Sequence, residues 1–311
     1  RSALAGLGSG LLFLAPAAFA DSWFDWRPWH GGDRAFNQVA TFANYTNRDD
    51  RNDETVSEIV ASTKDGRTLV YTDAASGAVG FVDITRASRP RGLGVFDLGD
   101  GAEPTSVDVL ANHFALVAVN TSDDFVDVSG ELVVLDVASQ QMIGSMPLGG
   151  QPDSLKISPD MRYVAIAIEN ERDEEICVGG SNNGIEVPED DDDAAAACLS
   201  GGGQVGVIPQ TIDGIGNPAG YLAIIDLVHP SSPASWTQRN VDLTGLDGCF
   251  AAEDPEPEFV DINDDNMAVV SLQENNCVAI VDLATGSVER SFSAGTVSLT
   301  DIDATEDDVM C

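Results

Sequence analysis

Short runs of apolar and β-branched residues alternate with turn-forming residues along most of the chain, most clearly in residues 256–288. Within this stretch, residues 259–262, 267–272 and 278–283 predict three strands, and clusters rich in Asn, Asp and Gly separate or follow them. Short β-branched runs between such clusters are typical of antiparallel hairpins. One meander cannot bury both faces of its sheet, so it needs neighbours of the same kind.

The chain supplies these neighbours as a repeat. An apolar–Asp–apolar triplet followed by a turn occurs at residues 82–84, 135–137, 225–227 and 281–283. The aspartates of successive triplets lie 53, 90 and 56 residues apart, and the long interval holds a segment rich in Cys, Asp and Gly. Without that segment the period is about 50 residues, the size of a β-propeller blade. We therefore predict an all-β fold, a β-propeller of the WD40/YVTN repeat-like kind with about seven blades when complete, in preference to a β-sandwich.

The repeat predicts four blades and the start of a fifth, at residues 55–104, 105–152, 153–255, 256–296 and 297–311. The third contains an acidic insertion, residues 171–219, which lacks apolar periodicity and is predicted to be a long loop. Its Asp run does not have the D-x-D-x-D-G order of an EF-hand. Residues 21–54 precede the first blade, and residues 36–42 within them have the composition of a strand that would close the ring.

The first residues of the chain resemble an export signal. Residues 1–20 hold an apolar run that ends in Ala18-Phe19-Ala20, which is the later part of a secretory signal peptide. We therefore expect a secreted, periplasmic or cell-surface bacterial protein, with no membrane span in the mature chain. The fifth repeat is only begun at residue 311, so the chain is predicted to be a fragment of a longer protein.

Five cysteines in an exported chain predict disulfide bonds. Cys177 and Cys198 bracket the insertion, and we expect them to pair. Cys249 and Cys277 occupy facing positions in the fourth repeat and form a second candidate pair. Four cysteines allow three connectivities, and Cys311 is left without a partner in this scheme.

The charge balance limits the classes of partner. The formal net charge is −37, and the only lysines are Lys64 and Lys156. Nucleic acid is excluded as a partner because its phosphates require basic residues, and binding to anionic lipid is disfavoured for the same reason. Two interpretations remain open, an acidic surface adapted to saline water and a protein that collects divalent cations.

Carboxylate and amide side chains recur just before the first strand and just after the second strand of each repeat. Propeller geometry would bring these positions together on one rim of the central channel. The candidates for ligand or metal binding are Glu58, Asp153, Glu169, Asn170, Glu171, Glu256, Glu258, Glu274 and Asn275. Ca²⁺ takes six to eight oxygen ligands, so such a rim could hold Ca²⁺ and, through it, a phosphate or carboxylate. The alternative is turn chemistry, in which Asn and Asp cap hairpins.

No catalytic residue is predicted from the sequence. The chain has no G-x-S-x-G nucleophile elbow. His30, His113 and His229 are isolated and lack zinc-ligand spacing. A quinone- or copper-dependent propeller oxidoreductase would need His or Cys ligands that are not at hand.

Several strings between residues 36 and 303 together resemble a known family. They include ETVSEIVASTKDGRTLVYTD, ALVAVNTS, GQPDSLKISPD, AIENERDE, DPEPEFVDIN and FSAGTVSLTDID. They are similar to secreted bacterial β-propeller proteins described as alkaline phosphatase-like, choice-of-anchor I or esterase-like activity of phytase.

The resemblance implies a propeller that belongs to a phytase-like phosphoesterase system and binds Ca²⁺ and an anionic or phosphorylated ligand at the central channel. In longer members a phytase-like esterase domain follows the propeller, so a phosphoric ester hydrolase activity would reside beyond residue 311. The alternative is a non-catalytic cell-surface propeller for adhesion or protein interaction.

Overall fold

The computed structural model describes residues 38–125, 127–173, 175–188, 192–206, 211–212, 215–216 and 218–298. The predicted signal peptide at residues 1–20 lies outside the described residues. So do Cys311 and nearly all of the predicted fifth repeat.

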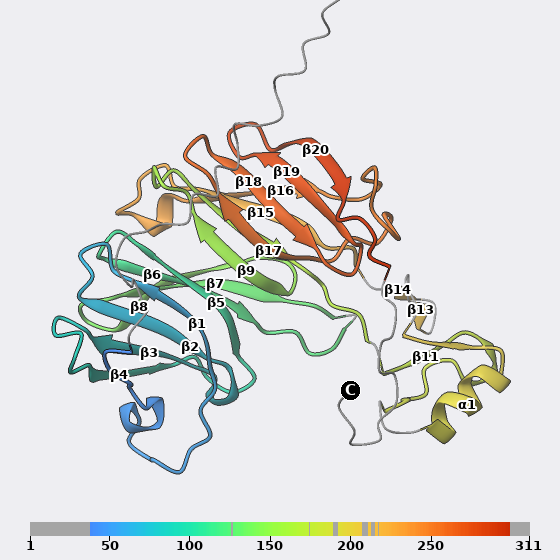
Figure 1. Ribbon diagram of the computed structural model, residues 1–311, viewed down its shortest axis with the longest axis horizontal. Helices are drawn as coiled ribbons and strands as arrows, with labels where there is room; N and C mark the ends of the chain where they lie inside the picture. Colours follow the sequence, from blue (N-terminus) through green and yellow to red (C-terminus); the bar gives the residue numbers. More distant parts are fainter. Residues whose placement is uncertain are drawn as a thin grey trace, which may run out of the picture. The chain divides into compact units, whose positions relative to one another are not determined.

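Four four-stranded antiparallel sheets, here called blades 1 to 4, account for most of the described residues (Figure 1). Blade 1 consists of β1 (Ser57–Ser62), β2 (Thr68–Asp73), β3 (Ala78–Asp83) and β4 (Arg91–Asp97). Blade 2 consists of β5 (Glu103–Leu110), β6 (Phe114–Asn120), β7 (Gly130–Asp136) and β8 (Gln141–Pro147). Blade 3 consists of β9 (Pro152–Ile157), β10 (Tyr163–Ile168), β15 (Tyr221–Asp226) and β16 (Thr237–Asp242). Blade 4 consists of β17 (Pro257–Ile262), β18 (Met267–Leu272), β19 (Cys277–Asp282) and β20 (Ser287–Ser293).

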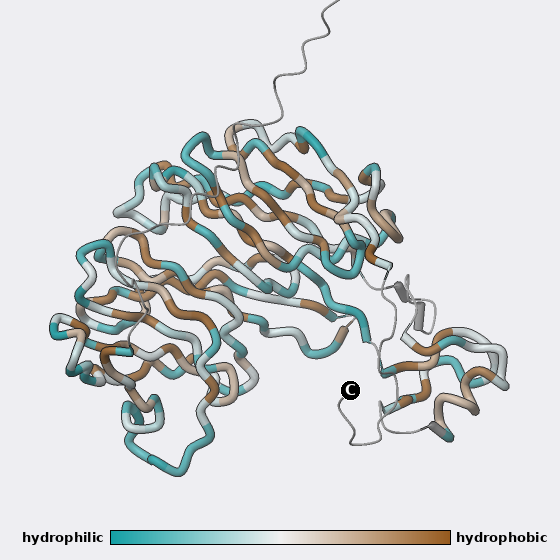
Figure 2. Tube along the Cα trace, viewed as in Figure 1, coloured by the Kyte–Doolittle hydropathy of each residue, from teal (hydrophilic) through white to brown (hydrophobic). Residues whose placement is uncertain are grey.

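The middle strands are buried on both faces, which explains their nearly continuous apolar sequences. Every residue of β10 is buried, and successive side chains enter different cores. Ile166 packs in a cluster with blade 2, whereas Ala165 packs in a cluster with blade 4. Figure 2 shows the hydrophobic residues concentrated in the strands and the hydrophilic residues in the turns. Each pair of consecutive blades therefore shares one core, because strand side chains alternate between faces.

The first strands of the blades, β1, β5, β9 and β17, contact one another in that order. A serine side chain joins consecutive first strands in two places. Ser106 Oγ accepts a hydrogen bond from the Leu155 N–H at 3.1 Å, and Ser154 Oγ accepts one from the Val260 N–H at 3.0 Å. Repeated four-stranded meanders that stack through their first strands form a β-propeller, so the predicted fold class is confirmed. The described residues make four blades and no closed ring, and the total of seven stays a prediction.

The segment before blade 1 differs from its prediction as a closing strand. Among its described residues, 38–43 form no strand, and a single 3-10 turn, η1 (Asn44–Asn47), follows. The Asn47 side chain bonds both the N–H and the carbonyl of Gly94, at 2.8 and 2.9 Å, and the carbonyl of Phe81. This segment is therefore held on blade 1 by side-chain contacts, since an asparagine can satisfy strand N–H and C=O groups without joining the ladder.

The insertion between β10 and β15 has more regular structure than the predicted loop. Its elements are β11 (Cys177–Val178), η3 (Gly180–Asn182), α1 (Asp192–Ser200), β12 (Gln204–Val205), β13 (Thr211–Ile212) and β14 (Ile215–Gly216). The helix follows from four consecutive alanines, the residue of highest helix propensity, with aspartates in the first turn. The predicted Cys177–Cys198 disulfide is present and packs with Val187 in a small separate core.

The second predicted disulfide, Cys249–Cys277, is also present, with a Cα–Cα distance of 5.0 Å. It joins the segment that leads into blade 4 to β19 of the same blade. Two further 3-10 turns, η2 (Ala74–Ser76) and η4 (Pro233–Ser235), lie in connections between strands. No helix in the described part of the chain is long and apolar enough to cross a membrane.

Candidate functional site

Each first strand is interrupted by a β-bulge at the same position of the repeat. The pairing register with the second strand shifts after the first one or two residues in all four blades. The side chains at this position are those of Glu58, Thr105, Asp153 and Glu258. Bulges redirect side chains and are frequent beside functional sites. Three of the four blades therefore present a carboxylate from the same local distortion, at the rim where the first strands begin.

Buried Asp and Asn side chains fix the backbone just ahead of these bulges. Asp73, Asn170 and Asn275 lie at or just after the end of the second strand in blades 1, 3 and 4, and all three are buried. The Oδ1 atom of each accepts a hydrogen bond from the backbone N–H two residues before the bulge carboxylate. The donors are Val56 at 2.8 Å, Gln151 at 2.9 Å and Glu256 at 2.8 Å. The repeat thus anchors the start of each of these first strands.

The two asparagines use their amide nitrogens as well. Asn170 Nδ2 donates to the carbonyl of Ala219 at 3.1 Å, and Asn275 Nδ2 donates to the carbonyl of Asp254 at 3.0 Å. Their side-chain oxygens and nitrogens are therefore engaged by the backbone. This is the capping chemistry that the sequence offered as the alternative to metal binding, and Asn170 and Asn275 are left out of the ligand set proposed below.

Asp153 lies at the centre of the acidic rim. Burial is the main cause that raises the pKa of its carboxyl group to about 7. The carboxylates of Glu258, Glu171, Glu58 and Glu103 raise it further. These residues belong to all four blades, so the predicted convergence of acidic side chains from several blades is present around Asp153.

Glu169, directly after β10, is the second partly buried carboxylate of the rim. Burial, followed by the charges of Asp153, Glu171, Glu258 and Glu256, raises its pKa to about 9. Since like charges and burial both disfavour ionisation, this carboxyl group is held neutral at pH 7 when no cation is nearby.

Glu256 and Glu258 contribute the blade 4 side of the rim. Burial raises the pKa of Glu256 to about 7, against the opposing effect of Arg172, and the charge of Glu274 raises it further. The Glu256 side chain is almost fully enclosed, and its Oε1 atom has no hydrogen-bond partner. Burial and the exposed Glu274 also raise the pKa of Glu258. The rim therefore contains a buried carboxylate oxygen that nothing in the described residues satisfies.

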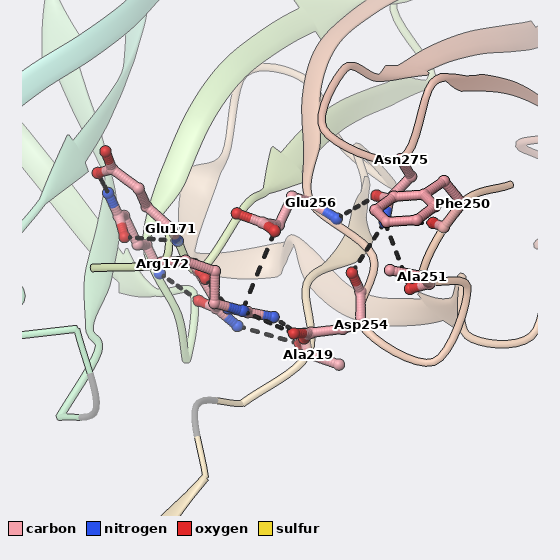
Figure 3. A network of polar contacts seen from close by, with 10 residues as sticks. Glu171, Arg172, Ala219, Phe250, Ala251, Asp254, Glu256 and Asn275 are labelled. Atoms are coloured by element: carbon pink, nitrogen blue, oxygen red, sulfur yellow. Dashed lines mark hydrogen bonds and ion pairs between the residues drawn. The ribbon is translucent and has the colours of Figure 1, made fainter. Parts of the chain in front are cut away.

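Arg172 is the residue of this site that the sequence reasoning missed. It is 2% exposed, forms an ion pair with Asp254 through Nε at 2.8 Å, and donates to the carbonyl of Asn170 (Figure 3). Its Nε also lies 4.0 Å from Glu256 Oε1. A signal was available, because Arg172 is the only Lys or Arg between residues 163 and 238, inside the most acidic part of the chain.

The first strands also enclose a cavity of about 340 Å³ below the rim. Its lining includes Ser106, Asp108, Ser154 and Lys156, and Lys156 Nζ lies 3.5 Å from Asp108 Oδ2. Within the described residues, no group of three or more His, Cys, Asp and Glu side chains already stands at metal-binding distances. The rim carboxylates are close enough to repel one another but are not drawn together around one point.

Residues 58–311 match the sequence model of the choice-of-anchor I domain. The chain belongs to the choice-of-anchor I family. This confirms that part of the resemblance noted in the sequence. The phytase-like and alkaline phosphatase-like descriptions remain predictions for this choice-of-anchor I propeller, and no curated protein matches it.

Among solved structures, three propeller-sized neighbours illustrate the likeness. A protein of unknown function from Bacteroides caccae is 12% identical over 77% of this chain and 61% of its own, with a TM-score of 0.41. A chain of a nidogen/laminin complex is 13% identical over 78% and 65%, with a TM-score of 0.42. The β-propeller domain of Cps50 (Swd1) from Myceliophteria thermophila is 10% identical over 77% and 57%, with a TM-score of 0.45. The choice-of-anchor I chain thus spans about three fifths of the length of these neighbours.

Proposed function

We propose that this choice-of-anchor I propeller is a surface-associated binding domain that takes up Ca²⁺ at its acidic rim and, through the ion, an anionic ligand. Family membership and two disulfides are consistent with an extracellular or cell-surface protein. The site in this proposal consists of Asp153, Glu169, Glu256 and Glu258.

The unpartnered Oε1 atom of Glu256 is the observation that carries the proposal. A buried carboxylate oxygen without a hydrogen-bond partner is costly, and a bound ion is one of its common explanations. Oxygen atoms of carboxylates are the ligands that Ca²⁺ prefers, and it accepts irregular geometry with water completing six to eight positions. Small side-chain rotations would be needed to gather the carboxylates, and the mutual repulsion that keeps them apart would vanish around a divalent cation.

The anionic ligand follows from the charge of the ion. A Ca²⁺ ion held by protein carboxylates on one side keeps positions open on the other, where phosphate or carboxylate oxygens bind. A phosphoester is the ligand class implied by the resemblance to phytase-like proteins. In that case the propeller would bind the ligand, and an esterase domain in the full-length protein would hydrolyse it.

Isothermal titration calorimetry with CaCl₂ tests the cation site directly. Asp153→Asn and Glu169→Gln are expected to weaken Ca²⁺ binding at least tenfold, because each removes a ligand charge. The matched control is Asp264→Asn, an exposed carboxylate in the turn between β17 and β18 at the opposite end of the strands, which should bind as the wild type does. Wild-type protein that binds no Ca²⁺ up to millimolar concentrations would overturn the proposal.

Phosphoester turnover separates the two versions of the function. Ca²⁺-dependent hydrolysis of a phosphoester by the full-length protein, lost in Asp153→Asn, would support a role in a phosphoesterase system. Ca²⁺-dependent binding of the same phosphoester without hydrolysis would support a non-catalytic adhesion or interaction propeller.

A further inference from the structure

The guanidinium of Arg172 lies among buried oxygen atoms from two blades (Figure 3). The Asp254 carboxylate pairs with it, the Asn170 carbonyl accepts a hydrogen bond from it, and Glu256 Oε1 is 4.0 Å from its Nε. Two carboxylates and a carbonyl form the kind of oxygen set that also coordinates Ca²⁺. An arginine side chain thus occupies a place whose surroundings suit a hard cation.

The segment that carries the two carboxylates is anchored independently of Arg172. The Cys249–Cys277 disulfide ties its start to β19, and Asn275 Nδ2 donates to the carbonyls of Phe250 and Asp254, both at 3.0 Å. Asn275 Oδ1 accepts the Glu256 N–H at the other end of the segment. Loss of the guanidinium would therefore leave the oxygen atoms in place and uncompensated.

We propose that Arg172 is a specificity-determining residue of the rim, a resident cation that holds Asp254 outside the Ca²⁺ site and thereby limits the Ca²⁺ affinity of that site. This inference rests on the proposed function. Asp254 is paired directly with Arg172, whereas Glu256 is at a distance that leaves Oε1 available to a free cation. A fixed positive charge beside Glu256 also repels a second cation at the same oxygen.

The sign of the effect distinguishes this role from a purely structural one. If Arg172 only held two blades together, its loss would disorder the rim and weaken Ca²⁺ binding. If it is a resident cation, its loss releases Asp254 as an additional ligand and removes a repulsive charge, so Ca²⁺ binds more tightly.

Arg172→Met, which keeps most of the length of the side chain and removes its charge, tests this by titration with CaCl₂. We expect Ca²⁺ affinity to rise at least tenfold over the wild type. The melting temperature should fall in EDTA and recover with CaCl₂ to a greater extent than in the wild type. Arg172→Lys is the matched control that keeps the charge, and its affinity should stay within threefold of the wild type. Unchanged or weaker Ca²⁺ binding by folded Arg172→Met would overturn the inference.

Asp254→Asn provides a second test that does not require loss of the arginine. Without its main partner, the guanidinium is free to pair with Glu256, so Ca²⁺ binding should weaken at least fivefold although Asp254 is not itself a ligand. Unchanged or tighter binding would contradict the inference.

Comparison of the titrations separates the two claims. Wild-type binding with no gain in Arg172→Met overturns the inference alone. Binding by Arg172→Met without binding by the wild type supports the cation-like cage and overturns the proposed function. Absence of binding in both overturns both.

Discussion

Ser154 Oγ on β9 accepts a hydrogen bond from the Val260 N–H on β17, at 3.0 Å, across the boundary between blades 3 and 4. Ser106 and Leu155 repeat this relationship between blades 2 and 3. In both cases a bulge has shifted the register of the donor strand, and a buried serine of the preceding blade satisfies the N–H group just beyond it. The same distortion that directs a carboxylate to the rim therefore provides a donor that joins consecutive blades.

Ser154→Ala should lower the free energy of unfolding by about 1–3 kcal/mol, because the buried Val260 N–H loses its acceptor. Urea unfolding followed by circular dichroism measures the change. Ser145→Ala on the exposed outer strand β8 is the control and should change the free energy by about 0.5 kcal/mol or less. Equal stability of Ser154→Ala and the wild type would show that water replaces the serine at this boundary.

The sequence repeat was sufficient to predict the blades, because turn residues mark the strand ends. In blade 4 the predicted strands at residues 267–272 and 278–283 coincide within one residue with β18 and β19. The outer strand β20 was not predicted, because it is mostly exposed and has few apolar positions. The helix of the insertion was also missed, since four alanines carry helix propensity but no amphipathic pattern.

Asn275→Ala should be among the most destabilising single changes in blade 4. The side chain is fully buried, and its loss leaves the Glu256 N–H and the carbonyls of Phe250 and Asp254 without a partner. We expect a loss of about 3 kcal/mol or more in the free energy of unfolding, since each buried unpaired group costs about 1–3 kcal/mol. Gln273→Ala, an exposed neighbour in the same turn, is the control. Similar stability of both variants in urea unfolding would refute the anchoring role of Asn275.

The candidate site could be predicted only as far as the repeat extends. The positions before the first strand and after the second identified the rim residues, including Asp153 and Glu169. The role of Arg172 depends on contact with Asp254, which lies 82 residues away and enters the rim only when blades 3 and 4 pack. Likewise, spacing placed Asn170 and Asn275 correctly in the repeat, but only the direction of their side chains shows that they bond the backbone.

The two disulfides should differ in their effect on the propeller. Replacement of Cys249 and Cys277 by alanine should lower the free energy of unfolding by about 2–4 kcal/mol, because the bond closes a loop within the blade 4 structure. Replacement of Cys177 and Cys198 should leave the unfolding midpoint of the propeller unchanged, since that bond belongs to the separate core of the insertion. Limited proteolysis should then cut the insertion first. A common loss of stability in both double variants would contradict this separation.

In the absence of divalent cations, the stability of the propeller should fall as the pH rises from about 5 to 9. The carboxyl groups of Asp153, Glu169 and Glu256 have pKa values of about 7, 9 and 7, all above those of the unfolded chain. The folded state therefore binds more protons than the unfolded state between the unfolded and folded pKa values. Stability is fully present below about pH 4 with respect to these groups, and is lost as the pH rises through their folded pKa values.

Urea unfolding at pH 5, 7 and 8.5 in EDTA measures this dependence. The double variant Asp153→Asn with Glu169→Gln should have a flatter pH profile and should be more stable than the wild type at pH 8.5, because two groups that resist ionisation are gone. The control Asp264→Asn should follow the wild type. Addition of CaCl₂ should raise wild-type stability most at pH 8.5, since the ion then compensates charges that repel one another. A wild-type profile that is flat or rises between pH 5 and 8.5 in EDTA would show that these carboxyl groups ionise without cost, and that the rim is more open to water than its burial indicates.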